Sequence, residues 1–328
     1  MREFDIVELI RKRTALARED VRLGIGDDAS LLEVPAGQQL VACSDTLVAG
    51  VHFPQATAPR DIGWKALAVN LSDLAAMGAT PAWAMLALTL PQADGRFVEA
   101  FADGFAELAR RHSVSLVGGD TTQGPMSVTV SAFGFVPEGR ALLRSGARVG
   151  DAVFVTGTPG DAAAALRCLD RGDKRADELL AAPANTREEL LARLNRPEPR
   201  IAGGLALRDV ANACIDVSDG LLADLGHVCA ASGVGAIVEA DALPSSSAML
   251  ALFDARERRA FALAGGDDYE LCFTASVARA DRIAADFARL GYGAARIGRI
   301  VAEPGVRVRD ANGNPVETPQ RGWQHFAP

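Results

Sequence analysis

Residues 65–83 read KALAVNLSDLAAMGATPAW, and this stretch contains a helix, its stop and the approach to a strand. Apolar residues recur at helical spacing through residues 61–77 and predict a helix with one buried face. That face comprises Ile62, Ala66, Val69 and Leu74. Gly78 stops the helix, and the apolar run at residues 83–90 predicts a strand directly after it.

The same mixture of helices and strands continues on both sides of this stretch. At the N-terminus, Phe4, Val7 and Ile10 stand at helical spacing and predict an amphipathic helix. Toward the C-terminus, residues 97–111 predict a second helix, and the alternating residues 127–136 predict a strand. Together these elements predict a mixed α+β half of the protein.

A Gly- and Arg-rich segment at residues 137–151 separates this half from a differently patterned one, which starts again with a strand at residues 152–156. The 328 residues are enough for two domains that each bury a core. We therefore place the boundary near Arg148, between domains at residues 1–147 and 148–328. The predicted fold class is α+β, with two mixed α/β-sheet domains.

Composition and charge exclude several classes of function. Lys and Arg number 34 against 42 Asp and Glu, and the net charge of −8 argues against binding to nucleic acid or to an acidic membrane. No apolar run reaches the roughly 20 residues of a membrane span, and no signal-peptide pattern is visible. The five cysteines are scattered without a CxxC pair, which argues against disulfides and structural zinc and favours the cytoplasm.

Six short segments share one design, in which an Asp follows Gly or Ser at the edge of an apolar element. They are GIGDD (Asp27, Asp28), CSDT (Asp45), NLSD (Asp73), GGD (Asp120), IDVSDG (Asp216, Asp219) and GGDDYE (Asp267, Asp268, Glu270). A single Asp of this kind is most often a helix cap or a turn residue. Six of them in one chain indicate instead that carboxylates converge on a common site.

Converging carboxylates repel one another unless a cation lies between them. Mg²⁺ suits such a site, because it takes a few carboxylates together with waters and substrate phosphates. The neighbouring glycines would let backbone N–H groups approach a phosphate closely. The chain has no GxxxxGK[ST], GxGxxG or HExxH pattern, so the chemistry it indicates is centred on a metal and a phosphorylated ligand.

Seven segments in order along the chain resemble the thiamine-monophosphate kinase family. They are GIGDD, SDTLVAGVHF, KALAVNLSDLAAMGATPAW, LVGGDTTQGP, LLRSGARVGD, DVSDGL and GGDDYELCF. The resemblance runs from about residue 24 to the C-terminus. It implies the two-domain α+β fold of the wider group that includes aminoimidazole ribonucleotide synthetase, and a homodimer joined through the N-terminal domains.

The resemblance also implies a reaction and a set of residues. The γ-phosphoryl group of ATP would move directly to thiamine monophosphate, giving thiamine diphosphate, the last step of its biosynthesis. Several Mg²⁺ ions would be bound by Asp28, Cys43, Ser44, Asp45, Asp73, Asp120, Asp216 and Asp219. Of these, Asp45, Asp73, Asp120 and Asp216 would be catalytic. ATP would contact Gly119, Asp120, Arg144 and Ser218. Thiamine monophosphate would contact His52, Asp267 and Trp323.

Two positions depart from the family pattern. The family usually has Glu where this chain has Asp267, and an oxygen-bearing residue is commoner at the position of Cys43. Two other functions stay open on the residues alone. One is another ATP-dependent enzyme of the same group, such as aminoimidazole ribonucleotide synthetase. The other is a phosphatase, because acid clusters with Mg²⁺ also hydrolyse phosphate esters.

Overall fold

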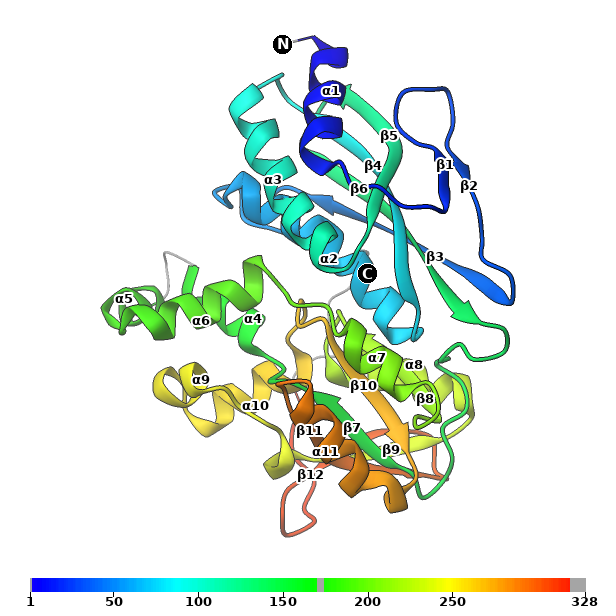
Figure 1. The fold of residues 1–328 in the computed structure, drawn as a ribbon. Helices are drawn as coiled ribbons and strands as arrows, with labels where there is room; N and C mark the ends of the chain where they lie inside the picture. The colour runs from blue at the N-terminus through cyan, green and yellow to red at the C-terminus, as the bar shows by residue number, and fades with distance from the viewer. Residues whose placement is uncertain (1, 170–173, 319–328) are drawn as a thin grey trace. The chain divides into compact units, whose positions relative to one another are not determined.

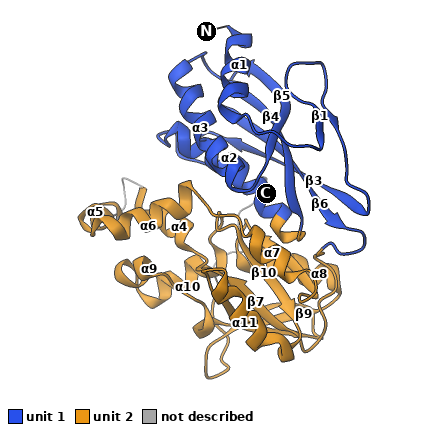
Figure 2. Ribbon diagram, viewed as in Figure 1, with its two compact units in different colours: residues 1–74, 79–141 blue, residues 75–78, 142–328 orange. Residues whose placement is uncertain are grey.

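The computed structural model describes residues 2–169 and 174–318 (Figure 1). The chain forms two compact units, shown in different colours in Figure 2. Unit 1 comprises residues 1–74 and 79–141, and unit 2 comprises residues 75–78 and 142–328. The chain thus passes from unit 1 to unit 2 after Ala141, six residues before the boundary expected from the sequence, and the end of one helix also belongs to unit 2.

Unit 1 is built on a four-stranded sheet in the order β3-β6-β4-β5. Only the β4–β5 pair is parallel. Helices α2 and α3 cover one face of this sheet, and α1 packs against α3 and β5 (Figure 1). A small two-stranded sheet, β1-β2, packs part of its apolar side against Trp83 and Val117. The helices are α1 (Glu3–Thr14), α2 (Pro59–Ala76) and α3 (Gly95–Arg111). The strands are β1 (Val21–Leu23), β2 (Leu31–Leu32), β3 (Gln38–Val48), β4 (Thr80–Leu90), β5 (Ser115–Gln123) and β6 (Ser127–Pro137).

The alternation predicted for residues 127–136 is confirmed, since Val128, Val130 and Ala132 are all at most 1% exposed. The prediction for α2 is wrong in one respect, because this helix is buried on nearly all sides rather than on one face. The reason is its crossing with α3, where a Cβ on Gly63 would lie 2.0 Å from the Phe101 oxygen. Glycines at the crossing let the two backbones approach, and α2 becomes a central helix.

The first helix forms as expected, but Phe4 is not part of its buried face. Helix α1 buries Ile6 and Ile10, whereas Phe4 is 80% exposed. Phe4 lies in the first turn, where the helix has little to pack against. The predicted contribution of Phe4 to the core is therefore wrong.

Unit 2 is built on a six-stranded sheet in the order β12-β9-β11-β7-β10-β8, antiparallel except for the β12–β9 pair. One core lies between this sheet and α8, and a second core joins α4, α6 and α9. The strands are β7 (Ala152–Thr156), β8 (Ala213–Val217), β9 (Gly235–Glu239), β10 (Glu270–Ala275), β11 (Ala294–Val301) and β12 (Gly305–Arg309). The helices are α4 (Asp161–Leu169), α5 (Lys174–Ala181), α6 (Ala184–Asn195), α7 (Ile201–Leu207), α8 (Leu221–Ser232), α9 (Ser247–Leu252), α10 (Ala255–Ala264) and α11 (Ala280–Arg289), with 3-10 turns η1 (Ala240–Ala242) and η2 (Val277–Arg279).

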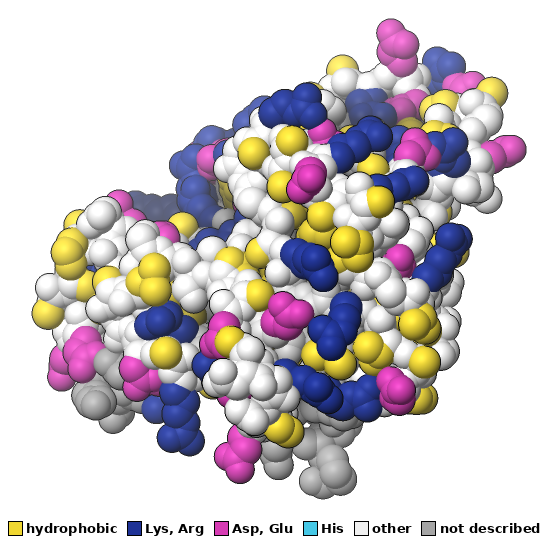
Figure 3. Space-filling model, turned by 90° about the horizontal axis from the view of Figure 1, so that it is seen from below, with side chains coloured by type: hydrophobic (Ala, Val, Ile, Leu, Met, Phe, Trp, Pro, Cys, Tyr) yellow, Lys and Arg dark blue, Asp and Glu magenta, His cyan; other side chains and the backbone are white. Residues whose placement is uncertain are grey.

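Two surface properties bear on function. No helix among the described residues is both long enough and apolar enough to cross a membrane. On the face seen in Figure 3, basic and acidic side chains are interspersed rather than gathered by sign.

Candidate active site

The first group of predicted site residues lies on the helix-covered side of β3. The burial of β3 alternates, so Cys43 and Asp45 are partly buried and point to the same side, whereas Ser44 lies on the exposed side. The Cys43 Sγ donates to the Asn70 backbone oxygen on α2 at 3.3 Å. One turn farther along α2 stands Asp73. The structure therefore places Cys43, Asp45 and Asp73 near one another.

The electrostatics of this group are those of crowded negative charge. Burial raises the pKa of the Cys43 thiol, and the carboxylates of Asp73 and Asp45 raise it further. Burial also raises the pKa of Asp45. Cys43 is therefore a neutral thiol beside two carboxyl groups, and a cation placed among them would lower their repulsion.

Ser44 does not share this group. Its Oγ lies 2.9 Å from the Ser131 Oγ on the outer face of the sheet, beside a second hydroxyl pair, Thr46 and Thr129, at 2.8 Å. Its side chain is thus turned away from Asp45, because neighbouring strand residues alternate. Only the backbone of Ser44 stays close to the Cys43–Asp45 side.

A second group forms where the GIGDD loop meets β5. The Ser30 Oγ donates to the Val117 oxygen at 2.6 Å and ties the two segments together. Ile25 of the loop and residues 118–121 line a shared cavity of about 60 Å³. The loop that carries Asp28 is therefore next to Asp120, and both carboxyl groups are exposed. Ser30 had no signal in the sequence beyond its closeness to GIGDD.

The two groups of unit 1 differ in their place on the sheet. Cross-strand pairs can be followed from β5 through β4 and β6 to β3. Along one such row Asp120 lies level with Thr46, by way of Ala87 and Thr129. Along the next row Gly119 lies level with Asp45, by way of Leu86 and Val130. Residues in one row point to the same face of the sheet, so the Asp120 side chain lies on the outer face with Thr46, and the Asp45 side chain lies on the helix-covered face. The acids of unit 1 form two groups rather than one.

His52 lies in the turn that follows β3. Its Nδ1 accepts from the Val48 backbone N–H at 2.9 Å, and Lys65 Nζ donates to the His52 backbone oxygen at 3.1 Å. Lys65 is only 2% exposed, an unusual position for a lysine. Because Nδ1 is an acceptor, the proton of the neutral imidazole is on Nε2. Lys65 was not recognised from the sequence, where a lysine in an apolar helix carries no distinct signal.

In unit 2 the IDVSDG segment begins in β8 and continues into the loop after it. Asp216 is buried in the strand, and the Asp224 Oδ2 accepts from the backbone N–H groups of Ser218, Asp219 and Gly220 at 3.1–3.2 Å. Burial raises the pKa of Asp224 to about 7, with the charges of Asp216 and Asp219 raising it as well. Asp224 was missed, although an Asp four residues after a Gly at a helix start is a usable signal.

The GGDDYE segment lies against this loop. The backbone N–H of Asp267 donates to the Ser218 oxygen at 2.8 Å, and that of Tyr269 donates to the Val217 oxygen at 2.8 Å. Both residues have positive φ, +66° at Asp267 and +51° at Tyr269. The Tyr269 hydroxyl donates to the Asp267 Oδ1 at 2.9 Å. The structure thus brings Ser218, Asp219 and Asp267 together.

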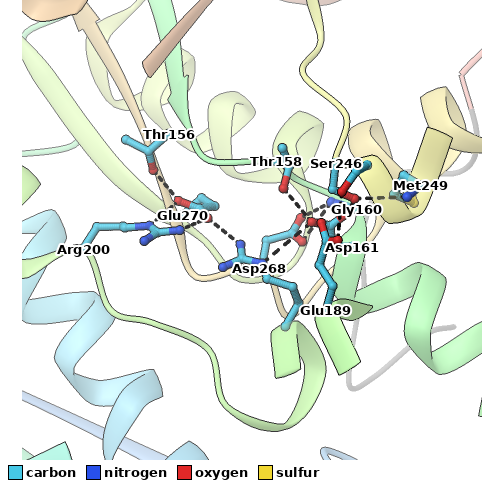
Figure 4. A network of polar contacts seen from close by, with 12 residues as sticks. Thr156, Thr158, Gly160, Asp161, Glu189, Arg200, Ser246, Met249, Asp268 and Glu270 are labelled. Atoms are coloured by element: carbon cyan, nitrogen blue, oxygen red, sulfur yellow. Dashed lines mark hydrogen bonds and ion pairs between the residues drawn. The ribbon is translucent and has the colours of Figure 1, made fainter. Parts of the chain in front are cut away.

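Behind this loop lies a buried polar network, drawn in Figure 4. Glu270 is fully buried, and its carboxylate accepts hydrogen bonds from three side chains. Arg200 donates two at 2.6 and 2.7 Å, the Thr156 hydroxyl donates one at 2.6 Å, and Arg193 donates another. Burial alone would raise the pKa of Glu270, but the two guanidinium groups hold it at about 2. Asp268, next to it in sequence, accepts from the Gly160 N–H with both oxygens at 2.8 Å. The two arginines lie in a polar segment whose sequence gave no sign of this role.

Arg144 lies away from the Asp219 loop of unit 2. The Arg144 side chain is exposed, and its backbone oxygen accepts from Ser232 at the end of α8, whereas Asp219 lies just before the start of that helix. The 12 residues of α8 span about 18 Å. Trp323 lies outside the described residues.

The acidic groups offer mainly carboxylate oxygens to a metal ion. Within residues 2–169 and 174–318, no three His, Cys, Asp or Glu side chains already converge tightly enough to hold a metal ion. The carboxylates are nevertheless close enough to raise the pKa values of Cys43 and Asp224. Carboxylate oxygens are the donors a hard cation prefers, so the residues present fit Mg²⁺.

Comparison with known proteins identifies two family domains in the chain. The AIR synthase related protein N-terminal domain matches residues 26–136, and the AIR synthase related protein C-terminal domain matches residues 148–311. The thiamine-monophosphate kinase of Salmonella typhimurium is 49% identical over 329 residues, covering 99% of this chain and 98% of that protein. The thiamine-monophosphate kinase of Escherichia coli K12 is 47% identical over 327 residues, with the same coverage.

Solved structures agree in fold. The thiamine-monophosphate kinase of Stenotrophomonas maltophilia superposes with a TM-score of 0.87 at 51% identity, covering 96% of this chain and 98% of that one. A structure described as AaThiL complexed with AMPPCP and TMP superposes with a TM-score of 0.77 at 30% identity, covering 99% of both chains. The hydrogenase maturation protein HypE of E. coli, at 22% identity and a TM-score of 0.75 over 96% of this chain and 97% of that one, shares the fold.

Proposed function

Because the chain belongs to the thiamine-monophosphate kinase family, within the AIR synthase related proteins, we propose that its acidic groups are where ATP and thiamine monophosphate meet. The reaction is the ATP-dependent phosphorylation of thiamine monophosphate to thiamine diphosphate. The observation that carries this conclusion is the 49% identity over 99% of the chain to a kinase of this name. A more distant relative binds an ATP analogue, AMPPCP, together with TMP.

The residues proposed to hold magnesium are those of the acidic groups already described. In unit 1 they are Asp28, Asp45, Asp73 and Asp120, with Cys43 and the backbone of Ser44 beside them. In unit 2 they are Asp216 and Asp219. Magnesium bound to such carboxylates would neutralise phosphate charge and favour in-line transfer. Burial raises the pKa of the Cys43 thiol most, and the nearby carboxylates of Asp73 and Asp45 raise it further; a cation among these groups would offset that negative charge, which supports this assignment.

The chain's own groups then bind and orient the two phosphates. The acceptor phosphate has a second pKa near 6, so it is already ionised at neutral pH and needs no strong general base. His52 presents its Nε2 proton, fixed there by the Val48 N–H bond to Nδ1, and we assign it as a donor to the substrate phosphate. Gly119 and Ser218 are proposed ATP contacts, and Asp267 a substrate contact. Arg144 and Trp323 stay proposals from the family resemblance alone.

A substrate assay tests the function. The protein is incubated with ATP, Mg²⁺ and, in turn, thiamine monophosphate, free thiamine or formylglycinamidine ribonucleotide, and the products are identified. We expect ADP and thiamine diphosphate with thiamine monophosphate only. ADP formation with the ribonucleotide would support the aminoimidazole ribonucleotide synthetase alternative, and release of inorganic phosphate without a diphosphate product would support the phosphatase.

The site assignment is tested at Asp45. Asp45→Asn removes a negative charge from the Cys43–Asp73 group while keeping its size, so we expect turnover to fall by about 100-fold or more. Mg²⁺ binding measured by calorimetry should weaken in parallel, and the circular dichroism spectrum should be unchanged. Asp281→Asn, at an exposed position on α11, is the matched control and should behave like the wild type. Full activity in Asp45→Asn would refute the assigned role.

We also propose a cytoplasmic homodimer. All five cysteines are free thiols, which is the usual state in a reducing compartment. The outer face of the unit 1 sheet leaves Leu40 47% and Met85 38% exposed next to the Ser44–Ser131 hydroxyl pair. A sheet face that carries exposed apolar side chains among neutral hydroxyl groups suits a second copy of the same sheet.

A further inference from the structure

The loop that carries Asp267 has an unusual backbone. Asp267 and Tyr269 both have left-handed φ values, +66° and +51°, although neither is glycine. A tyrosine in this region is strained, and such a conformation persists only where the surroundings fix it. Contacts with the rest of unit 2, rather than the local conformational preference of its residues, therefore hold the segment from Gly265 to Glu270 in this conformation.

Those contacts include the backbone N–H bonds of both strained residues to the Ser218 and Val217 oxygens, and side-chain contacts of the residues that flank them. On one side, Glu270 is fully buried and bonded to Arg193 and Arg200. Between the strained residues, Asp268 is 2% exposed and accepts twice from the Gly160 N–H (Figure 4). The loop is thus anchored at alternate residues, and the side chains of Asp267 and Tyr269 are left to face each other.

The result is a direct contact between these two side chains. The Tyr269 hydroxyl donates to the Asp267 Oδ1 at 2.9 Å, and Tyr269 is itself 8% exposed. Asp267 carries one methylene fewer than the Glu usual in the family. A shorter carboxylate reaches less far and has one torsion fewer with which to reach a ligand, so a contact from this position depends more on the carboxylate already being aimed at the ligand.

We propose that Tyr269 is a positioning residue, which orients the Asp267 carboxylate toward thiamine monophosphate through its hydroxyl. This inference rests on the proposed role of Asp267 as a substrate contact. The Glu270 network contributes by keeping the backbone in the left-handed conformation that brings hydroxyl and carboxylate together. Tyr269 itself does not touch the substrate.

The test is a double-mutant cycle on the full-length protein. Tyr269→Phe keeps the buried ring and removes only the hydroxyl, and Asp267→Gly removes the carboxylate at a position where glycine adopts positive φ without strain. We expect Tyr269→Phe to raise the KM for thiamine monophosphate about fivefold to tenfold, with the KM for ATP unchanged. In the Asp267→Gly background, Tyr269→Phe should have no further effect.

The chain's other tyrosine provides a matched control. Tyr292 packs its ring against Phe287 at 5.7 Å, and its buried hydroxyl, close to the Gly203 backbone, has no hydrogen-bond partner among the described residues. Tyr292→Phe should leave both KM values unchanged. Asp267→Asn is a second variant, since its amide oxygen still accepts from the Tyr269 hydroxyl and coupling between the two positions should persist.

Different outcomes bear on the role of Tyr269, on the substrate contact at Asp267 and on the kinase function. An unchanged KM in Tyr269→Phe, or an equal effect of Tyr269→Phe with and without the carboxylate, would overturn the positioning role. If Asp267→Gly leaves the KM for thiamine monophosphate unchanged, the substrate contact at Asp267 fails, and the positioning role with it. Absence of thiamine diphosphate from the wild-type reaction would instead refute the function. Loss of the near-UV circular dichroism signal in Tyr269→Phe would show a structural role and also count against the proposal.

Discussion

Gly119 lies where β5 passes closest to the backbone of β4. Its φ is +148°, and a Cβ at this position would lie 1.8 Å from the Leu86 oxygen. The sequence suggested that glycines here let a phosphate approach the backbone. The structure adds a second requirement, because no side chain fits between the two strands at this point.

Gly119→Ala is therefore expected to destabilise the fold. We predict a loss of about 2–4 kcal/mol in the free energy of unfolding, since backbone must shift to accept the methyl group. Gly118→Ala is the matched control, because its Cβ would meet no backbone atom, only the flexible end of Met85 at 3.2 Å and the Ser30 Oγ at 3.3 Å. Its cost should stay below about 1 kcal/mol. Urea unfolding of both variants measures the difference, and equal losses would contradict the argument.

At the scale of elements, the spacing of apolar residues in the sequence was enough to predict several strands and long helices. The strand at residues 152–156 is confirmed as β7, and the helix at residues 97–111 as α3, because each has a clear apolar pattern. The acidic segments were recognised one by one, but their grouping was not. Whether Asp45 lies with Asp73 or with Asp120 depends on strand register, which no local pattern shows. The alanine-rich helix expected after β7 is confirmed as α4. Helices α5 and α6 near Arg193 were not predicted, since their apolar residues form a core only together with α4 and α9.

The anchoring of β10 by Glu270 gives a pH-dependent stability. Arg193 and Arg200 outweigh burial and hold the pKa of Glu270 at about 2, against an ordinary 4.5. A depressed pKa stabilises the folded state above pH 4.5, and this stabilisation is lost as the pH falls toward 2. The neighbouring acids Asp161 and Asp268 have raised pKa values, caused first by burial, and act in the opposite sense.

Glu270→Gln isolates the contribution of this one group. At pH 6 the variant should be less stable than the wild type by about 3 kcal/mol, because two buried guanidinium groups lose their counter-charge. The difference should shrink as the pH falls from 4.5 toward 2, since wild-type Glu270 then becomes protonated too. Urea unfolding of both proteins at several pH values measures it. A difference that is independent of pH would refute the ion-pair account.

At the scale of the whole molecule, the two α/β units are those of the AIR synthase related fold. Each has its own sheet and its own helices. The family and its reaction could be read from the sequence, because seven short segments keep their order along 328 residues. The exact division of the chain into two units could not be predicted from the sequence. A helix whose residues belong to two units, as those of α2 do, shows the same apolar pattern as any other helix.

The proposed homodimer predicts a change of mass on mutation. Sedimentation velocity should give twice the chain mass for the wild type. Met85→Glu places a charge on the outer face of the sheet and should shift the species to the monomer. Leu250→Glu, at a position that is 59% exposed on α9, is the control and should stay dimeric. A monomeric wild type, or a dimer unaffected by Met85→Glu, would exclude this interface.

The last turn of α2 has a consequence for anyone who wishes to dissect the protein. Residues 75–78 belong to unit 2, where Arg208 Nε donates to the Gly78 oxygen at 2.6 Å and Gly204 lies against the Ala75 backbone. A gene cut after codon 141 would leave this peptide on the wrong fragment. The C-terminal piece would then expose the surface that residues 75–78 occupy, so recombinant halves should be co-expressed rather than purified singly.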